Sequence, residues 1–159
     1  MAKPKVEFKK VCSDPLPGGL ARRKQPMTET YRMEPLTTQR WPDFERLFGA
    51  RGACGGCWCR FWKLPSRDFE AQLHEGNRKA QRAIARSGVM PGLLAHSGSD
   101  PVGWIAVEAC SSHLRLATSR TLKSIDDEPV WSITCFYVGQ PCRRRGITVG
   151  FLRAAIRYV

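Results

Sequence analysis

The chain has 159 residues, 42% hydrophobic and 25% charged, which is typical of one globular domain rather than of a disordered or fibrous chain. No apolar run approaches the roughly 18 residues that a membrane-spanning helix needs, and no apolar segment near the N-terminus indicates a signal peptide. The net charge of +12 favours anionic ligands or partners, and the seven cysteines predict reduced thiols in the cytoplasm.

The first 27 residues are predicted to form a basic tail before a domain of residues 28–159. The tail is rich in lysine and arginine. Its prolines and the Gly18-Gly19 pair argue against a helix. We therefore expect the fold to be specified by residues 28–159.

The domain is predicted to begin with a strand and a short helix. Residues 28–37 contain large apolar side chains and predict a first strand that ends near Pro35. Thr38 is the predicted N-cap of a helix with Phe44 and Phe48 on its apolar face. Glycines then end this helix and lead into an unusual loop.

That loop, residues 54–62, contains Cys54, Cys57 and Cys59 among glycines and tryptophans. The C-x-x-C spacing of the first two cysteines suits half of a zinc site or a redox dithiol. No second C-x-x-C pair and no histidine pair accompany it. We therefore favour a structural role, in which small and aromatic side chains pack a tight loop or line a pocket.

The centre of the chain predicts one long helix and one hairpin. Residues 66–87 predict a single helix with Ser66 as its N-cap. Its predicted apolar face comprises Phe69, Leu73, Ala80 and Ile84. Residues 92–96 and 102–108 predict the two strands of a hairpin, and residues 110–129 predict a polar loop.

The last thirty residues predict a strand, a turn and a helix. Residues 130–138 are apolar on both alternating faces, which predicts a strand covered by helices on both sides. One predicted face carries Val130, Phe136 and Val138, and the other carries Trp131, Ile133 and Tyr137. The predicted stripe of the helix, at i, i+3, i+4 and i+7, comprises Leu152, Ala155, Ile156 and Val159.

A basic loop, Arg143 to Gly146, joins this strand to this helix. The first N–H groups of a helix have no partner, and the helix dipole favours an anion beside them. A glycine there lets a ligand approach the backbone closely. The loop therefore predicts a phosphate site, although its glycines fit neither a P-loop nor a G-x-G-x-x-G motif. The alternative is an ordinary basic loop on the surface.

The loop resembles the acetyl-CoA signature of the GNAT (GCN5-related) N-acetyltransferases, Arg/Gln-x-x-Gly-x-Gly/Ala. Arg143, Arg144, Arg145 and Gly146 match the first four positions, whereas Thr148 stands where the family usually has Gly or Ala. The hairpin is also similar to the family's hairpin, since its second strand contains Gly-Trp-Ile at residues 103–105. The resemblance covers roughly residues 28–159.

The resemblance implies an α+β fold with a mixed, mainly antiparallel central sheet flanked by helices on both faces. It implies an N-acyltransferase that takes an acetyl group from acetyl-CoA, without a metal. The implied acetyl-CoA-binding residues are Phe136, Tyr137, Val138, Arg143, Arg144, Arg145, Gly146, Ile147 and Thr148. The implied acceptor is an amine, on a small molecule or a peptide, in a pocket lined by Cys57, Trp58, Phe61 and Trp62.

GNAT domains continue beyond the corresponding helix with further strands and another helix. The resemblance therefore implies a domain that is incomplete at its C-terminus, without the tyrosine that often serves as the family's general acid. The strand of residues 130–138 would then have an open edge, a template for association with other chains. We expect such a chain to be marginally stable or to self-associate, and to be a weak or inactive catalyst.

The chemistry of amine acylation requires a base. A lysine-type amine has a pKa of about 10.4, so the neutral nucleophile at pH 7 costs roughly 4–5 kcal/mol. Glu108, at the end of the hairpin, is the first candidate for this base, and Asp127 and Glu128 are the next. A backbone N–H near Tyr137 or Val138 is the candidate donor to the thioester oxygen.

Two other classes of function stay open on the sequence alone. The positive charge suits a nucleic-acid-binding module, although no helix concentrates basic residues beside aromatic side chains that bases stack on. The cysteines at 54, 57 and 59 suit a zinc or redox module. A chain that binds acetyl-CoA without catalysing a reaction is a further alternative.

Overall fold

The computed structural model describes residues 31–122 and 128–159, so the predicted tail of residues 1–27 lies outside the described residues. The strands are β1 (Arg32–Pro35), β2 (Gly92–Ser97), β3 (Asp100–Ala109) and β4 (Trp131–Val138). The helices are α1 (Trp41–Phe48), α2 (Ser66–Ala71), α3 (Glu75–Arg86), α4 (Leu114–Ala117) and α5 (Ile147–Tyr158), with short 3₁₀ turns η1 (Cys110–Ser112) and η2 (Gln140–Cys142).

The four strands form one sheet in the order β1-β2-β3-β4, and every neighbouring pair is antiparallel. The predicted hairpin is confirmed as β2 and β3, with Leu94 opposite Trp104. On its other edge β3 pairs with β4, with Trp104 opposite Tyr137. The expected α+β fold with a mainly antiparallel sheet is therefore confirmed, and β4 is an edge strand among the described residues.

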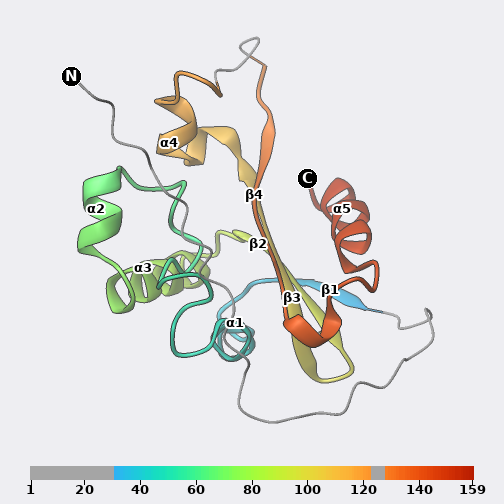
Figure 1. The fold of residues 1–159 in the computed structure, drawn as a ribbon. Helices are drawn as coiled ribbons and strands as arrows, with labels where there is room; N and C mark the ends of the chain where they lie inside the picture. Colours follow the sequence, from blue (N-terminus) through green and yellow to red (C-terminus); the bar gives the residue numbers. More distant parts are fainter. Residues whose placement is uncertain (1–30, 123–127) are drawn as a thin grey trace.

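Helix α5 lies on one side of the sheet, and α1 and α3 lie on the other (Figure 1). Each face of the sheet carries its own hydrophobic core. Successive side chains of a strand point to opposite faces, so Trp104 joins the core under α1 while Ile105 joins the core under α5. The core under α1 contains Trp41, Phe44, Phe48, Trp58, Ala85 and Trp104. The core under α5 contains Leu93, Ile105, Val107, Ile147, Phe151 and Ala155. Helices thus cover both faces, as the resemblance implies.

The single helix predicted over residues 66–87 is wrong, because the chain forms α2 and α3 with a break between them. His74 adopts a left-handed conformation with φ 63° at this break. Its N–H donates to the carbonyl of Gly56, 3.1 Å away, so a contact with the cysteine-rich loop replaces a helical hydrogen bond. The buried residues of α3 are consequently Asn77, Gln81 and Ala85, rather than Ala80 and Ile84.

Neither predicted N-cap stands at the start of its helix. Thr38 lies two residues before Arg40, the N-cap of α1, and its hydroxyl donates to the carbonyl of Ala85 on α3 instead. Ser66 is the first residue of α2, with Pro65 in the N-cap position. In both cases the preference of serine and threonine for N-caps placed the helix start within two residues, which is the usual uncertainty of such boundaries.

The predicted stripe of the last helix is also mostly wrong. Helix α5 buries Ile147, Phe151, Ala154 and Ala155, whereas Leu152 and Ile156 are 44% and 75% exposed. Gly103 of β3 explains this rotation. A Cβ added there would lie 3.0 Å from the Phe151 ring, so the missing side chain makes the space into which Phe151 packs.

A bulge in β4 changes which residues share a face. Ile133 lies opposite Val107 and Cys135 lies opposite Ala106, so Thr134 between them has no opposite residue on β3. The bulge shifts the alternation by one residue. Ile133 therefore shares the α5 side of the sheet with Phe136, and the predicted faces of this strand are wrong.

The expectation that helices cover both faces of this strand is wrong as well. Helix α5 packs mainly against β1, β2 and β3. Although Trp131 and Phe136 reach the Tyr158 and Phe151 rings of α5, these two side chains stay 51% and 44% exposed, and Ile133 is 40% exposed. The α5 side of β4 is thus a partly uncovered apolar surface.

Candidate functional site

A cavity of about 420 Å³ lies where β4 ends and α5 begins. Its lining comprises Cys54, Phe136, Tyr137, Val138, Cys142, Arg143, Arg144, Gly146, Ile147 and Thr148. All the residues predicted to bind acetyl-CoA therefore line one cavity, except Arg145. We call it the arginine cavity. Cys54 and Cys142 were not predicted to belong to it.

The backbone of the loop is shaped by two left-handed residues. Gly146 has φ 77° and is the N-cap of α5, and its carbonyl accepts hydrogen bonds from the N–H groups of Val149 and Gly150 at 3.1 and 3.2 Å. Arg144 has φ 64°, a conformation that costs a residue with a side chain on the order of 1–3 kcal/mol. Such turns orient successive N–H groups toward one side, which is how backbone anion sites are built.

The bare backbone at Gly146 is accessible. A Cβ built on this glycine would meet no atom within 4 Å, so open space surrounds the start of α5. The N–H groups of Ile147 and Thr148 belong to the first turn of this helix, where no intrahelical carbonyl can accept from them. An anion can therefore approach these donors closely.

The charge of the arginine cavity has one sign. Arg143 and Arg144 line it, and none of the described residues in its lining is acidic. The Nε of Arg143 donates to the carbonyl of Val138 at 3.1 Å, which ties the loop to the end of β4. Two guanidinium groups and the positive end of a helix dipole thus act in the same direction.

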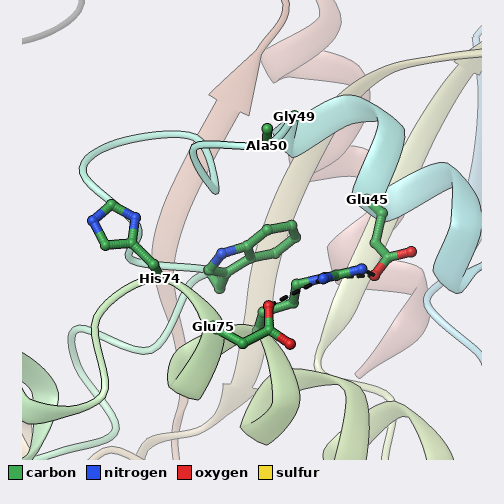
Figure 2. A pocket seen from close by; sticks show the side chains of 7 residues that line it. Glu45, Gly49, Ala50, His74 and Glu75 are labelled. Atoms are coloured by element: carbon green, nitrogen blue, oxygen red, sulfur yellow. Dashed lines mark hydrogen bonds and ion pairs between the residues drawn. The ribbon is translucent and has the colours of Figure 1, made fainter.

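A second cavity of about 420 Å³ lies between α1, α3 and the loop after α1. Its lining comprises Glu45, Gly49, Ala50, Trp58, His74, Glu75 and Arg78. Figure 2 shows Glu45 and Glu75 on neighbouring helices, and the dashed lines mark the ion pairs of these carboxylates with a guanidinium that lies between them. Arg78 makes these pairs, at 2.7 Å to Glu45 and 3.0 Å to Glu75, so we call this the paired-charge cavity.

The four residues implied to line an acceptor pocket do not share either of these two cavities. Trp58 lines the paired-charge cavity and is buried beneath Arg78, whose guanidinium lies 5.8 Å from the ring centre. Phe61 packs against Trp62, with ring centres 5.3 Å apart. The thiol of Cys57 is within 3.7 Å of the Gly52 carbonyl. These contacts are those of a packed loop.

Cys57 and Cys59 do not show the environment of reactive thiols. Burial raises the pKa of Cys57. A hydrogen bond with Cys135, together with burial, raises the pKa of Cys59 well above its usual value, and Trp104 Nε1 donates to the Cys59 sulfur at 3.2 Å. A reactive thiol needs a lowered pKa. In residues 31–122 and 128–159, no three histidine, cysteine or acidic side chains group as a metal site requires.

Glu108, the first candidate for the base, is buried in an ion pair. Its Oε2 lies 2.5 Å from Lys63 Nζ, and the two side chains are only 7% and 9% exposed. Glu108 lies four residues along β3 from Trp104, the partner of Tyr137, which is about 13 Å at 3.3 Å per residue. The carboxylate is therefore some distance from the arginine cavity.

The other two candidates are not placed beside either cavity. Glu128 is exposed just before β4 and lines neither of the two cavities. Asp127 lies outside the described residues. The structure thus brings the predicted phosphate-binding residues together, and it does not gather the predicted acid–base residues around them.

Within the described residues, no helix has both the length and the apolar character that crossing a membrane requires. No protein-family model and no curated protein matches the chain. Among solved structures, a GCN5-related N-acetyltransferase from Ralstonia eutropha is similar over 81% of this chain and 75% of that one, at 16% identity and a TM-score of 0.47.

Two further solved structures are similar to the chain. An aminoglycoside acetyltransferase from an uncultured soil metagenomic sample, in complex with sisomicin, matches 80% of this chain and 68% of its own, at 14% identity and a TM-score of 0.46. Arabidopsis thaliana NAA60, in complex with acetyl-CoA, matches 81% and 69%, at 16% identity and a TM-score of 0.41. Similarity at this level assigns neither a family nor an activity to the chain.

Proposed function

We propose that this protein is an acyl-CoA-dependent N-acyltransferase that uses acetyl-CoA as the donor. The observation that carries the proposal is the arginine cavity, where an apolar strand, a loop with two left-handed residues and an open helix N-terminus meet. Eight of the ten residues that line it are among those that the sequence resemblance implies for acetyl-CoA. The location of the protein in the cytoplasm stays a prediction from the sequence.

The residues present fit coenzyme A. The N–H groups of Ile147 and Thr148 would hold the pyrophosphate, with Arg143 and Arg144 supplying positive charge beside it. The apolar side chains at the end of β4, from Phe136 to Val138, would lie along the pantetheine arm. An acidic side chain in the lining would oppose the phosphates, and none is present among the described lining residues.

Acetyl-CoA supplies an acetyl group on a thioester, which an amine attacks while the carbon–sulfur bond breaks. The chain must then accept the proton that the amine loses. Glu108 stays our candidate, because a carboxylate can accept a proton and this one lies in a buried ion pair with Lys63. In this role Lys63 has to move aside, or a water has to relay the proton across the distance to the cavity.

The acceptor in this proposal is an amine of a small molecule or a peptide. A thiol-release assay with acetyl-CoA and a panel of amines tests the activity. We expect release of coenzyme A that depends on one class of amine and falls at least tenfold in Gly146→Asp. The matched control is Gly146→Asn, which has the same shape without the charge and tolerates the left-handed backbone. No release with any amine, or equal release from both variants, contradicts the proposal.

A further inference from the structure

Exposed apolar side chains lie outside both cores, on the α5 side of β4 and on the outer part of α5. Trp131, Ile133 and Phe136 contribute from the strand, and each is at least 40% exposed. The exposed apolar stripe of α5 comprises Val149, Leu152, Ile156 and Val159. The outer edge of β4 has no strand partner within residues 31–122 and 128–159. Strand β4 therefore combines a backbone edge without a strand partner among the described residues and exposed apolar side chains.

Leu152 lies on the flank of α5 that faces away from β1. On the opposite flank of α5, Gly150 packs so closely on β1 that an added Cβ would lie 2.9 Å from Met33 Cε. At 100° per residue, Leu152 lies roughly 160° around the helix from Gly150. Since the sheet runs from β1 to β4, the flank away from β1 faces the side of β4.

Because of the bulge, the order in which the side chains of β4 point to the two sides of the sheet is nearly the same from either end of the strand. Trp131, Ile133, Phe136 and Val138 point to the α5 side, while Ser132 and Tyr137 point to the other side. We propose that β4 pairs antiparallel with β4 of a second copy of this chain. In this register Ile133 lies opposite Phe136 of the second copy, and Trp131 lies opposite Val138.

This register places unlike charges together. Residues 129–159 contain arginine but neither aspartate nor glutamate, and Arg143 follows the C-terminal end of β4. Glu128 precedes the N-terminal end, so an antiparallel partner brings Glu128 of one copy near the 141–143 region of the other. The two arginine loops lie at opposite ends of an eight-residue strand, about 26 Å apart and well beyond the screening length of roughly 8 Å.

The other edge of the sheet, strand β1, is unfavourable for pairing with a second copy. Strand β1 has four residues, and Arg32, Glu34 and Pro35 supply the charges and the proline that blunt edge strands. Pairing between β4 and β1 of another copy, which would continue as an open chain of molecules, is therefore disfavoured. Pairing of β4 with itself closes after two copies.

Sedimentation velocity of the full chain in reducing buffer, from 1 to 100 μM, tests the proposal. We expect a monomer–dimer equilibrium in this range, with no larger species. Ile133→Lys places a charge on the exposed apolar face and should weaken the dimer at least tenfold. Leu73→Lys is the matched control, since Leu73 is 37% exposed and lies in the turn between α2 and α3. A monomer at every concentration, open-ended assembly or equal effects of both variants overturns the proposal.

A charge exchange tests the register. Glu128→Arg and Arg143→Glu should each weaken the dimer by at least threefold, because each places like charges together. The double variant should return to within twofold of the unmodified chain. If the loss of dimer affinity in the double variant equals the product of the losses in the two single variants, the two side chains do not meet and the proposed register is wrong.

Discussion

The arginine cavity and the paired-charge cavity have the same volume, about 420 Å³, but opposite electrostatic organisation. In the paired-charge cavity, Arg78 bridges the carboxylates of Glu45 and Glu75. In the arginine cavity, two arginines and the start of a helix face the same space without an acidic residue among the described lining. The first arrangement satisfies its own charges, whereas the second is complementary to an anion.

The backbone, more than the volume, distinguishes the two cavities. The arginine cavity lies at the N-terminus of α5, where donors of the first helical turn have no intrahelical acceptor. The paired-charge cavity is lined by side chains of α1 and α3 that satisfy one another. Variants of each cavity should therefore act on different properties, ligand binding for one and stability for the other.

The largest effect is expected at Gly146. An aspartate there places a carboxylate beside the donors of Ile147 and Thr148, at a backbone with φ 77°. We expect calorimetry to show acetyl-CoA affinity at least a hundredfold weaker in Gly146→Asp. In the uncharged Gly146→Asn the loss should stay below tenfold. Equal losses in the two variants would show that charge at this point does not decide binding.

A smaller loss of affinity is expected from the arginines. Arg143→Gln and Arg144→Gln should each weaken acetyl-CoA binding about tenfold, the equivalent of one charge-assisted hydrogen bond. The loss should shrink in high salt, because salt screens exposed charges. Titrations of each variant at two salt concentrations check this. An affinity that does not respond to either arginine would separate the loop from the ligand.

Acid should lower the free energy of unfolding of this protein. Burial, with Lys63 nearby, lowers the pKa of His113, whose Nε2 lies 3.3 Å from the Thr134 hydroxyl. The unfolded chain therefore binds a proton, near pH 6.5, that the folded chain does not. Stability should rise with pH, by up to about 1.4 kcal/mol per unit, from the lowered pKa up to pH 6.5.

Urea denaturation of the unmodified chain and of His113→Gln, from pH 5 to pH 7, measures this slope. The variant removes the titrating group and should show a smaller dependence on pH. If the two proteins lose stability in parallel on acidification, other groups are responsible and the role assigned to His113 is wrong.

The smallest effect is expected in the paired-charge cavity. Arg78→Met removes ion pairs of a side chain that is 39% exposed, so the free energy of unfolding should fall by no more than about 1 kcal/mol. Acetyl-CoA affinity should not change, since this cavity is separate from the arginine cavity. A fall in affinity comparable to that of Arg143→Gln would show that the two cavities are not independent.

The sequence predicts best what depends on neighbouring residues. The hairpin turn, the strand of residues 131–138 and the helix start at Gly146 follow from local patterns, and the residues predicted to bind acetyl-CoA lie within thirteen positions of one another. Local chemistry specifies them because strand, loop and helix are consecutive. Their convergence on one cavity needs no contact from the distant chain, apart from the support of the sheet.

Contacts between distant segments explain the failures. The Gly56 carbonyl holds His74 and divides the helix predicted over residues 66–87. The space at Gly103 turns Phe151 inward and leaves Ile156 exposed. Cys54 is far from β4 in sequence but lines the arginine cavity, and no local sequence pattern predicts this position. Each outcome depends on a partner that periodicity within one element does not reveal.

The central claim, that the arginine cavity binds coenzyme A by its phosphates, is tested most directly by comparing two ligands. Calorimetry of the unmodified chain with acetyl-CoA and with S-acetylpantetheine, which carries the same thioester without phosphates, separates the two halves of the ligand. We predict that acetyl-CoA binds and that S-acetylpantetheine binds at least a hundredfold more weakly. Equal affinities, or no binding of acetyl-CoA, would contradict the account.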